Sequence, residues 1–189
     1  MSATIKYLTE EETRRLFKVI SEDNSVHADR NKAIFYLAKY LALRASEVGL
    51  LLLGDYNIAT KSIYCRRLKG SISNTMKIVD DLVLLYFEKY YKKRLSEGGT
   101  EDDPIFQSQK NSAISRKTLD SLIKGYSKKS GICNYKSHFH VLRHTRAIEL
   151  IEYGDIELRD VQFWLGHKNI SNTMIYLSFS IKAQTMLFN

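Results

Sequence analysis

The residue types most suited to chemistry are concentrated between His138 and Tyr176, in the string HFHVLRHTRAIELIEYGDIELRDVQFWLGHKNISNTMIY. A helix through the first part of this string places His140, Arg143 and His144 on one face. Cationic and titratable side chains grouped without an acid are unfavourable unless an anion lies among them. The spacing therefore predicts a phosphate site, with a tyrosine hydroxyl available as a nucleophile.

The second half of the string continues this pattern. After Gly154, a short helix is expected over Leu158–Leu165, followed by a Gly-His-Lys turn that contains His167. Ser171 is expected to cap a helix that carries Tyr176. Taken singly, a histidine after Leu-Gly or one tyrosine among twelve is usually a packing residue, so only their ordered combination indicates a site.

A metal centre is the competing interpretation of the same segment. Its donors would be Cys133, His138, His140 and His144. A guanidinium at Arg143 would repel a dication there, and neither a carboxylate nor a second cysteine completes a familiar zinc pattern. The sequence therefore favours a site without a metal, and it predicts no cofactor.

Helices with clear signals must position these groups. Thr9 followed by three glutamates predicts a helix start, and apolar periodicity predicts a second helix from about Ala28 to Leu43. A further helix is expected over Leu82–Arg94, and another is expected to start with Ser115 as its cap. On the third of these helices, the residues expected to face the core are Leu82, Leu85, Tyr86 and Tyr90.

Arg44 follows the second helix directly and would be a rigidly held cation. Ser46 is a plausible cap for a short helix with Glu47 in its first turn. The alternative interpretation is an arginine that complements the negative end of the helix dipole.

Alternating, β-branched and aromatic residues predict about three antiparallel strands, over Asp55–Thr60, Ser62–Arg67 and Thr75–Val79. The expected fold class is therefore α+β, mainly α-helical with a small three-stranded antiparallel sheet. The hairpin is basic and contains no acid between residues 61 and 77, which fits either a phosphate backbone or an edge strand protected by lysines. A second basic segment spans residues 110–129. From these two segments, the candidate DNA contacts are Arg66, Arg67, Arg116, Lys117 and Lys124.

Composition limits the class of protein. The chain has 189 residues, 44% of them hydrophobic and 26% charged, with one proline and nine glycines, which favours a helical globular domain. The formal charge of +8 favours a polyanionic partner, although charge alone is also compatible with none. Two isolated cysteines, a polar N-terminus and short apolar runs predict a soluble protein of the reducing cytoplasm, without a membrane segment.

Taken in order, the site residues resemble the tyrosine recombinase (phage integrase) family. The family pattern has an arginine in a string such as R-x-S-E, a lysine in a β-hairpin, then H-x-x-R, L-G-H and a tyrosine about nine residues later. The matching positions here are Arg44 in RASE, Lys69 in RLKG, His140 and Arg143 in HVLRH, His167 in LGH, and Tyr176. Six positions matched in order make the resemblance specific, although Lys61 and Lys77 also flank the hairpin. It covers almost the whole chain as the catalytic core that breaks and rejoins DNA.

The resemblance implies site-specific recombination through a covalent 3′-phosphotyrosine at Tyr176. Arg44 and Arg143 would bind the non-bridging oxygens, because guanidinium donates bidentate bonds. His167 would donate a further hydrogen bond, and Lys69 would protonate the leaving 5′ oxygen.

The remaining polar groups receive supporting roles. His140 is expected to manage the tyrosine proton, since histidine titrates near neutrality. Glu47 and His144 are expected to orient their neighbours. No metal or nucleotide is needed for this chemistry.

The resemblance also implies double-stranded DNA as partner and a tetramer on two DNA sites, from a protein that is a monomer when free. Residues 1–189 are expected to form the catalytic domain alone, without the helical clamping domain that precedes it in many members. The RASE and RLKG strings resemble the single-domain enzymes that invert fimbrial promoter segments, although LAL stands before Arg44 where many members have a glycine-containing turn.

Two other functions stay open at this point. One is a type IB topoisomerase-like enzyme that relaxes DNA with the same site. The other is a non-catalytic basic module that only binds DNA.

Overall fold

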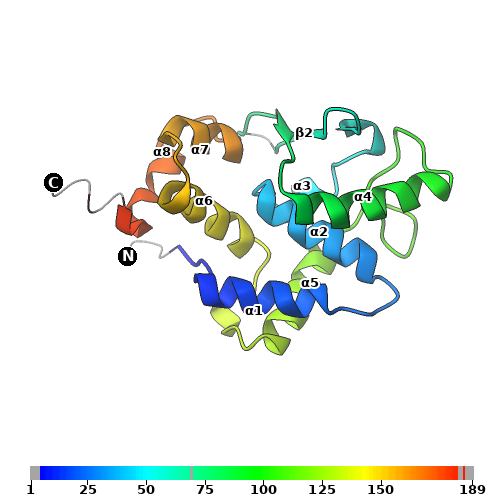
Figure 1. The fold of residues 1–189 in the computed structure, drawn as a ribbon, viewed down its shortest axis with the longest axis horizontal. Coiled ribbons are helices and arrows are strands. Elements are labelled where there is room, and N and C mark those ends of the chain that lie inside the picture. The colour runs from blue at the N-terminus through cyan, green and yellow to red at the C-terminus, as the bar shows by residue number, and fades with distance from the viewer. Residues whose placement is uncertain (1–4, 69, 183–184, 186–189) are drawn as a thin grey trace.

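The computed structural model describes residues 5–68, 70–182 and 185. Figure 1 shows a bundle of helices with a small sheet at one edge. The longer helices are α1 (Glu10–Ser21), α2 (Ala28–Tyr40), α4 (Asp81–Ser96), α5 (Arg116–Lys129), α6 (Val141–Tyr153) and α7 (Leu158–Leu165). The short ones are α3 (Ala45–Val48), α8 (Ser171–Met174), η1 (Leu53–Asp55), η2 (Asn134–Lys136) and η3 (Leu177–Phe179).

The sheet has three antiparallel strands in the order β1 (Tyr56–Asn57), β2 (Ser62–Cys65) and β3 (Asn74–Lys77). Ile63 pairs with Met76, and both side chains are buried, so one face of the hairpin covers the core. The predicted fold class is confirmed.

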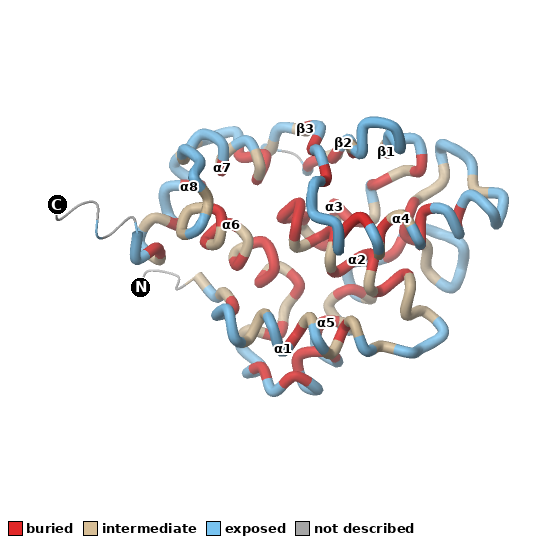
Figure 2. Tube along the Cα trace, in the orientation of Figure 1, coloured by how far each residue is buried: buried red, intermediate tan, exposed pale blue. Residues whose placement is uncertain are grey.

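Helix α2 is the centre of the core, and Figure 2 shows buried residues along most of its length. Ile34, Phe35 and Leu37 are fully buried there, and the helix packs against α1, α4 and α6. This follows from its sequence, which is apolar around most of its surface.

The caps predicted for two helices are confirmed. Thr9 accepts a hydrogen bond from the backbone of Glu12, whose carboxylate in turn accepts one from the backbone of Thr9. Ser115 likewise caps α5 by accepting from the backbone of Thr118. Each pair satisfies backbone donors that a helix start otherwise leaves without a partner.

Three local predictions were wrong. Ser46 is not a cap, because α3 starts at Ala45 and Arg44 occupies the capping position. Ser171 is not a cap either, because it is the first residue of α8, and this helix ends at Met174, before Tyr176. On α4, Leu82 and Leu85 are exposed, whereas Val83 and Phe87 are buried. The face of α4 is set by its packing on α2 and by Tyr56, whose ring lies 4.8 Å from that of Phe87.

Helix α2 ends in a turn that matters for the site. Ala42 adopts a left-handed conformation with φ of 52° and is fully buried. Figure 1 places α6, α7 and α8 together at one end of the molecule, next to this turn and α3. In the described part of the chain, no helix is long and apolar enough to cross a membrane.

Candidate active site

Arg143 is the buried centre of the site. Its side chain lies in the first turn of α6 and is 1% exposed. Its two terminal nitrogens donate to the carbonyl oxygens of Ala42 and Leu165, each at 2.7 Å. Two hydrogen bonds therefore fix the guanidinium between the end of α2 and the end of α7, and they leave its other N–H groups for a ligand.

Glu47 connects two further arginines, Arg44 and Arg67. Its carboxylate is fully buried and pairs with Arg44 at 2.6 Å and with Arg67 at 3.1 Å. Burial alone would raise the pKa of Glu47, but the charges of Arg67 and Arg44 and a backbone hydrogen bond hold that pKa below its ordinary value. Glu47 is thus ionised and orients Arg44, whose side chain stays 27% exposed.

Arg67 ties the hairpin to α7. Its Nη2 donates to the carbonyl oxygens of Leu41 and Trp164, at 3.2 and 2.9 Å. Nearby, the backbone N–H of Ile72 donates to the carbonyl of Gly166 at 2.9 Å. Gly166 needs to be glycine, because its φ is 67° and a Cβ there would lie 2.7 Å from the Ile72 oxygen.

His167 follows this glycine and points one nitrogen inward. Its Nδ1 lies 2.9 Å from the hydroxyl of Thr173, which is fully buried in α8. A hydrogen bond at one ring nitrogen fixes the orientation of the imidazole. His167 is therefore held with its Nε2 available to a ligand.

Tyr176 lies just beyond α8 and is only 2% exposed. Its hydroxyl is 2.9 Å from Nδ1 of His144 on α6. Burial raises the pKa of Tyr176, while the charges of Arg143 and Arg44 oppose that rise. The hydroxyl thus lies in the positive field of both arginines.

The field at the site is positive. Burial and the charge of Arg143 lower the pKa of His140 and of His167 to about 4. Burial and the neighbouring His140 lower the pKa of His144 to about 3. Burial and the charge of Arg44 lower the pKa of Arg143 itself to about 10. Neutral histidines among fixed arginines indicate that the cluster is built for an anion.

Five of the six predicted catalytic residues therefore lie together: Arg44, His140, Arg143, His167 and Tyr176. The sixth, Lys69, lies outside the described residues. Within the described part of the chain, no group of three or more metal-binding side chains is placed to hold an ion.

The candidate DNA contacts divide into two sets. The prediction for Arg67 was wrong, because its side chain is fully buried against Glu47 and does not reach a ligand at the surface. Arg66 is 40% exposed and pairs with Asp55, and Arg116 is 75% exposed. Lys117 and Lys124 are exposed on α5, which packs against α1 and α3; their contact with DNA stays a prediction.

Two contributors were not predicted from the sequence. Ser71 accepts a hydrogen bond from Arg44 at 3.0 Å, and Thr173 orients His167. Hydroxyl residues beside turns are common, so no local signal distinguishes these two.

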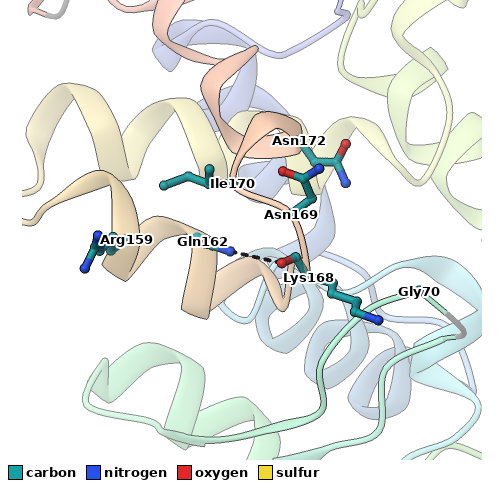
Figure 3. A pocket seen from close by; sticks show the side chains of 7 residues that line it. All are labelled: Gly70, Arg159, Gln162, Lys168, Asn169, Ile170 and Asn172. Atoms are coloured by element: carbon teal, nitrogen blue, oxygen red, sulfur yellow. Dashed lines mark hydrogen bonds between the residues drawn. The ribbon is translucent and has the colours of Figure 1, made fainter.

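An open depression of about 880 Å³ adjoins the site on the side of the hairpin (Figure 3). The side chain of Gln162 stabilises the backbone at this depression by donating to the carbonyls of His167 and Lys168, at 3.0 and 3.4 Å. In Figure 3, Lys168 runs toward the turn at Gly70. The lining contains cations and amides but no carboxylate: Gly70, Arg159, Gln162, Lys168, Asn169, Ile170 and Asn172.

The sequence pattern of the family described as "Phage integrase family" matches residues 6–181. The chain is 31% identical to tyrosine recombinase XerC of Caldanaerobacter subterraneus subsp. tengcongensis over 170 residues, which are 90% of this chain and 46% of that protein. It is also 31% identical to the type 1 fimbriae regulatory protein FimB of Escherichia coli K12, over 90% of this chain and 82% of FimB. The chain thus spans about half of one curated relative and most of the other.

Solved structures give the same picture. The crystal structure of XerA recombinase superposes with a TM-score of 0.81 and 28% identity, over 100% of this chain and 65% of that one. XerH recombinase, solved in a post-cleavage complex with its difH substrate, has the same fold, with a TM-score of 0.80 and 21% identity over 98% of this chain and 53% of that one.

Proposed function

Because this chain belongs to the phage integrase family, we propose that it is a tyrosine site-specific recombinase that breaks and rejoins DNA strands. The observation that carries this proposal is the buried Tyr176 hydroxyl, which lies in the electrostatic field of the Arg143 and Arg44 charges. A nucleophile next to two fixed cations is the arrangement that attack on a phosphodiester requires.

The chemistry follows from these groups. The Tyr176 oxygen attacks phosphorus, the bond to the 5′ oxygen breaks, and a 3′-phosphotyrosine forms. Arg44, Arg143 and His167 donate hydrogen bonds to the non-bridging oxygens, where negative charge develops. Attack by a free 5′ hydroxyl from a second duplex then reverses the step and joins exchanged strands. The arginines supply the positive charge that phosphoryl transfer needs.

Double-stranded DNA is the proposed partner, and a tetramer on two DNA sites is the proposed assembly. The net charge of +8 supports a polyanion. The depression beside His167 supports it further, because cations and amides are the donors that phosphate oxygens accept from. Lys69 is proposed, on the resemblance alone, as the acid for the 5′ oxygen.

The first test is covalent trapping. The protein is incubated with fragments of the DNA that flanks its gene, and denatured adducts are sequenced, which also maps the target site. Tyr176→Phe should abolish adducts while DNA binding survives, because only the attacking oxygen is lost. Tyr153→Phe is the matched control, since Tyr153 is 74% exposed, and it should form adducts like the unmodified chain.

The outcomes separate the three candidate functions. Recombined products from two mapped sites support a recombinase, whereas relaxation of supercoils without exchange indicates a topoisomerase-like enzyme. DNA binding with no adduct from the unmodified chain indicates a binding module and contradicts the proposal. Adducts that persist in Tyr176→Phe place the nucleophile elsewhere.

A further inference from the structure

His144 makes the hydrogen bond to the reacting oxygen. Its Nδ1 lies 2.9 Å from the hydroxyl of Tyr176, and the two rings are inclined by 52° with centroids 5.7 Å apart. His144 sits on α6, one residue after Arg143.

The direction of this hydrogen bond follows from the phenol proton. Tyr176 is 2% exposed, and burial raises its pKa, so the phenol keeps its proton. A buried hydroxyl proton needs an acceptor. Nδ1 of His144 is the acceptor in contact, which places the N–H of its imidazole at Nε2.

His140 is the next histidine in this cluster, and it contacts His144. Its ring packs edge-on against the ring of His144, with centroids 4.4 Å apart and an interplanar angle of 86°. The charge of Arg143 is the second cause, after burial, of its lowered pKa, so His140 lies beside the phosphate-binding arginine. Among the described residues, the imidazole that hydrogen-bonds Tyr176 is that of His144.

We propose that His144, rather than His140, is the catalytic residue that accepts the Tyr176 proton during strand cleavage. This inference rests on the proposed function. In the step, the Tyr176 O–H bond breaks and its proton moves to Nδ1 while the phenol oxygen bonds to phosphorus. The electron pair of the P–O5′ bond leaves with the 5′ oxygen, which is protonated by a separate acid. In the reverse step, the imidazolium returns the proton to the departing tyrosine.

Charge compensation makes the transfer feasible. In the free protein, burial, the neighbouring histidines and the charge of Arg143 lower the pKa of His144, so that it is neutral and hence an acceptor. A phosphodiester bound at Arg143 and Arg44 neutralises part of that positive charge and favours the imidazolium. Substrate binding therefore raises the basicity of His144 when the proton has to move.

The rival explanation is that His144 only holds the phenol in place. His144→Asn separates the two roles, because the asparagine side-chain oxygen replaces Nδ1 as an acceptor but does not take a proton at neutral pH. Single-turnover cleavage of a nicked suicide duplex, carrying the site mapped by trapping, is measured for His144→Asn and His144→Ala. We expect both variants to cleave about a hundredfold or more slowly, within the usual range for loss of a general base.

The matched control is His138→Asn. His138 is a half-buried histidine on the same segment, and its pKa is lowered chiefly by burial. The His138→Asn variant should cleave DNA at close to the rate of the unmodified chain. If His144→Asn recovers most of the cleavage rate and His144→Ala does not, the proposed proton transfer is wrong and His144 only positions Tyr176.

Fluorotyrosine at position 176 gives an independent readout. Fluorination lowers the phenol pKa, so an ionised nucleophile no longer needs a base. In the His144 variants, fluorotyrosine should restore cleavage by at least about tenfold relative to tyrosine, and in the unmodified chain it should change the rate little. A defect of folding or position would not respond in this way, so equal rates for tyrosine and fluorotyrosine in His144→Ala overturn the proposal.

Failure of this inference differs from failure of the proposed function. If Tyr176→Phe abolishes adducts but the His144 variants cleave normally, the recombinase assignment stands and the role of His144 falls. If the unmodified chain forms no adduct, both fall together.

Discussion

At the scale of single residues, Arg66 and Arg67 show how adjacent identical side chains acquire different roles. Arg67 is fully buried and pairs with Glu47, and Arg66 pairs with Asp55 while remaining 40% exposed. Breaking a buried pair leaves an uncompensated charge, whereas a pair whose cation is 40% exposed, as in Arg66 with Asp55, is screened by water and contributes less.

Arg67→Met should therefore lower the free energy of unfolding by about 3 kcal/mol, because Glu47 and two backbone carbonyls lose a donor. Arg66→Met, the matched control, should lower it by no more than about 1 kcal/mol. Urea denaturation followed by circular dichroism measures both. Equal losses in the two variants would show that the buried pair has no special weight.

The sequence supports most of the site at this scale because the chemistry requires particular residue types in a particular order. Arg44, Arg143 and Tyr176 were predicted for that reason, and the structure brings them together. The division between Arg66 and Arg67 was not predictable, because it depends on which of two neighbouring side chains faces α3 and α7. His144 was assigned a supporting role, since its contact with Tyr176 depends on how the end of the chain packs onto α6.

At the scale of elements, capping residues were the most reliable signals. Thr9 and Ser115 accept hydrogen bonds from backbone groups three residues later, so the local sequence is enough to predict their effect. The buried face of α4 was predicted wrongly at Leu82 and Leu85, because that helix is apolar on several faces and its partners select one.

The turn between β1 and β2 carries backbone strain that an exchange can relieve. Lys61 is exposed and has a φ of 52°, and its carbonyl accepts a hydrogen bond from the backbone of Ile78 at 2.8 Å. Lys61→Gly should raise the free energy of unfolding by up to about 1 kcal/mol, because glycine adopts this conformation without a Cβ clash. Lys61→Ala removes the same charge but keeps the strain, so thermal melting should show no gain. A gain in the alanine variant would attribute the effect to charge.

At the scale of the whole molecule, the neutral histidines couple stability to pH. His140, His144 and His167 have pKa values lowered from 6.5 to about 4, 3 and 4. Between these values and 6.5 the unfolded chain binds protons that the folded chain does not, so the free energy of unfolding falls as pH decreases.

The loss should begin near pH 6.5 and continue to about pH 4. Buried carboxylates such as Glu47 have lowered pKa values and add to the loss only below about 4.5, their ordinary value. The urea midpoint should therefore be lower at pH 5 than at pH 7, and unfolding in this interval should take up protons. An unchanged midpoint over that interval would contradict the burial of neutral histidines.

Arg143 depends on distant parts of the chain, since the carbonyls that hold it belong to Ala42 and Leu165. The proposed nucleophile follows later still, at residue 176. A chain still emerging from the ribosome, or one whose last segment has come loose, thus has an incomplete set of reacting groups. For a protein proposed to bond covalently to DNA, this dependence on complete folding is a safeguard. A partly folded copy lacks the groups needed to cleave a strand, so it does not leave broken DNA bound to protein.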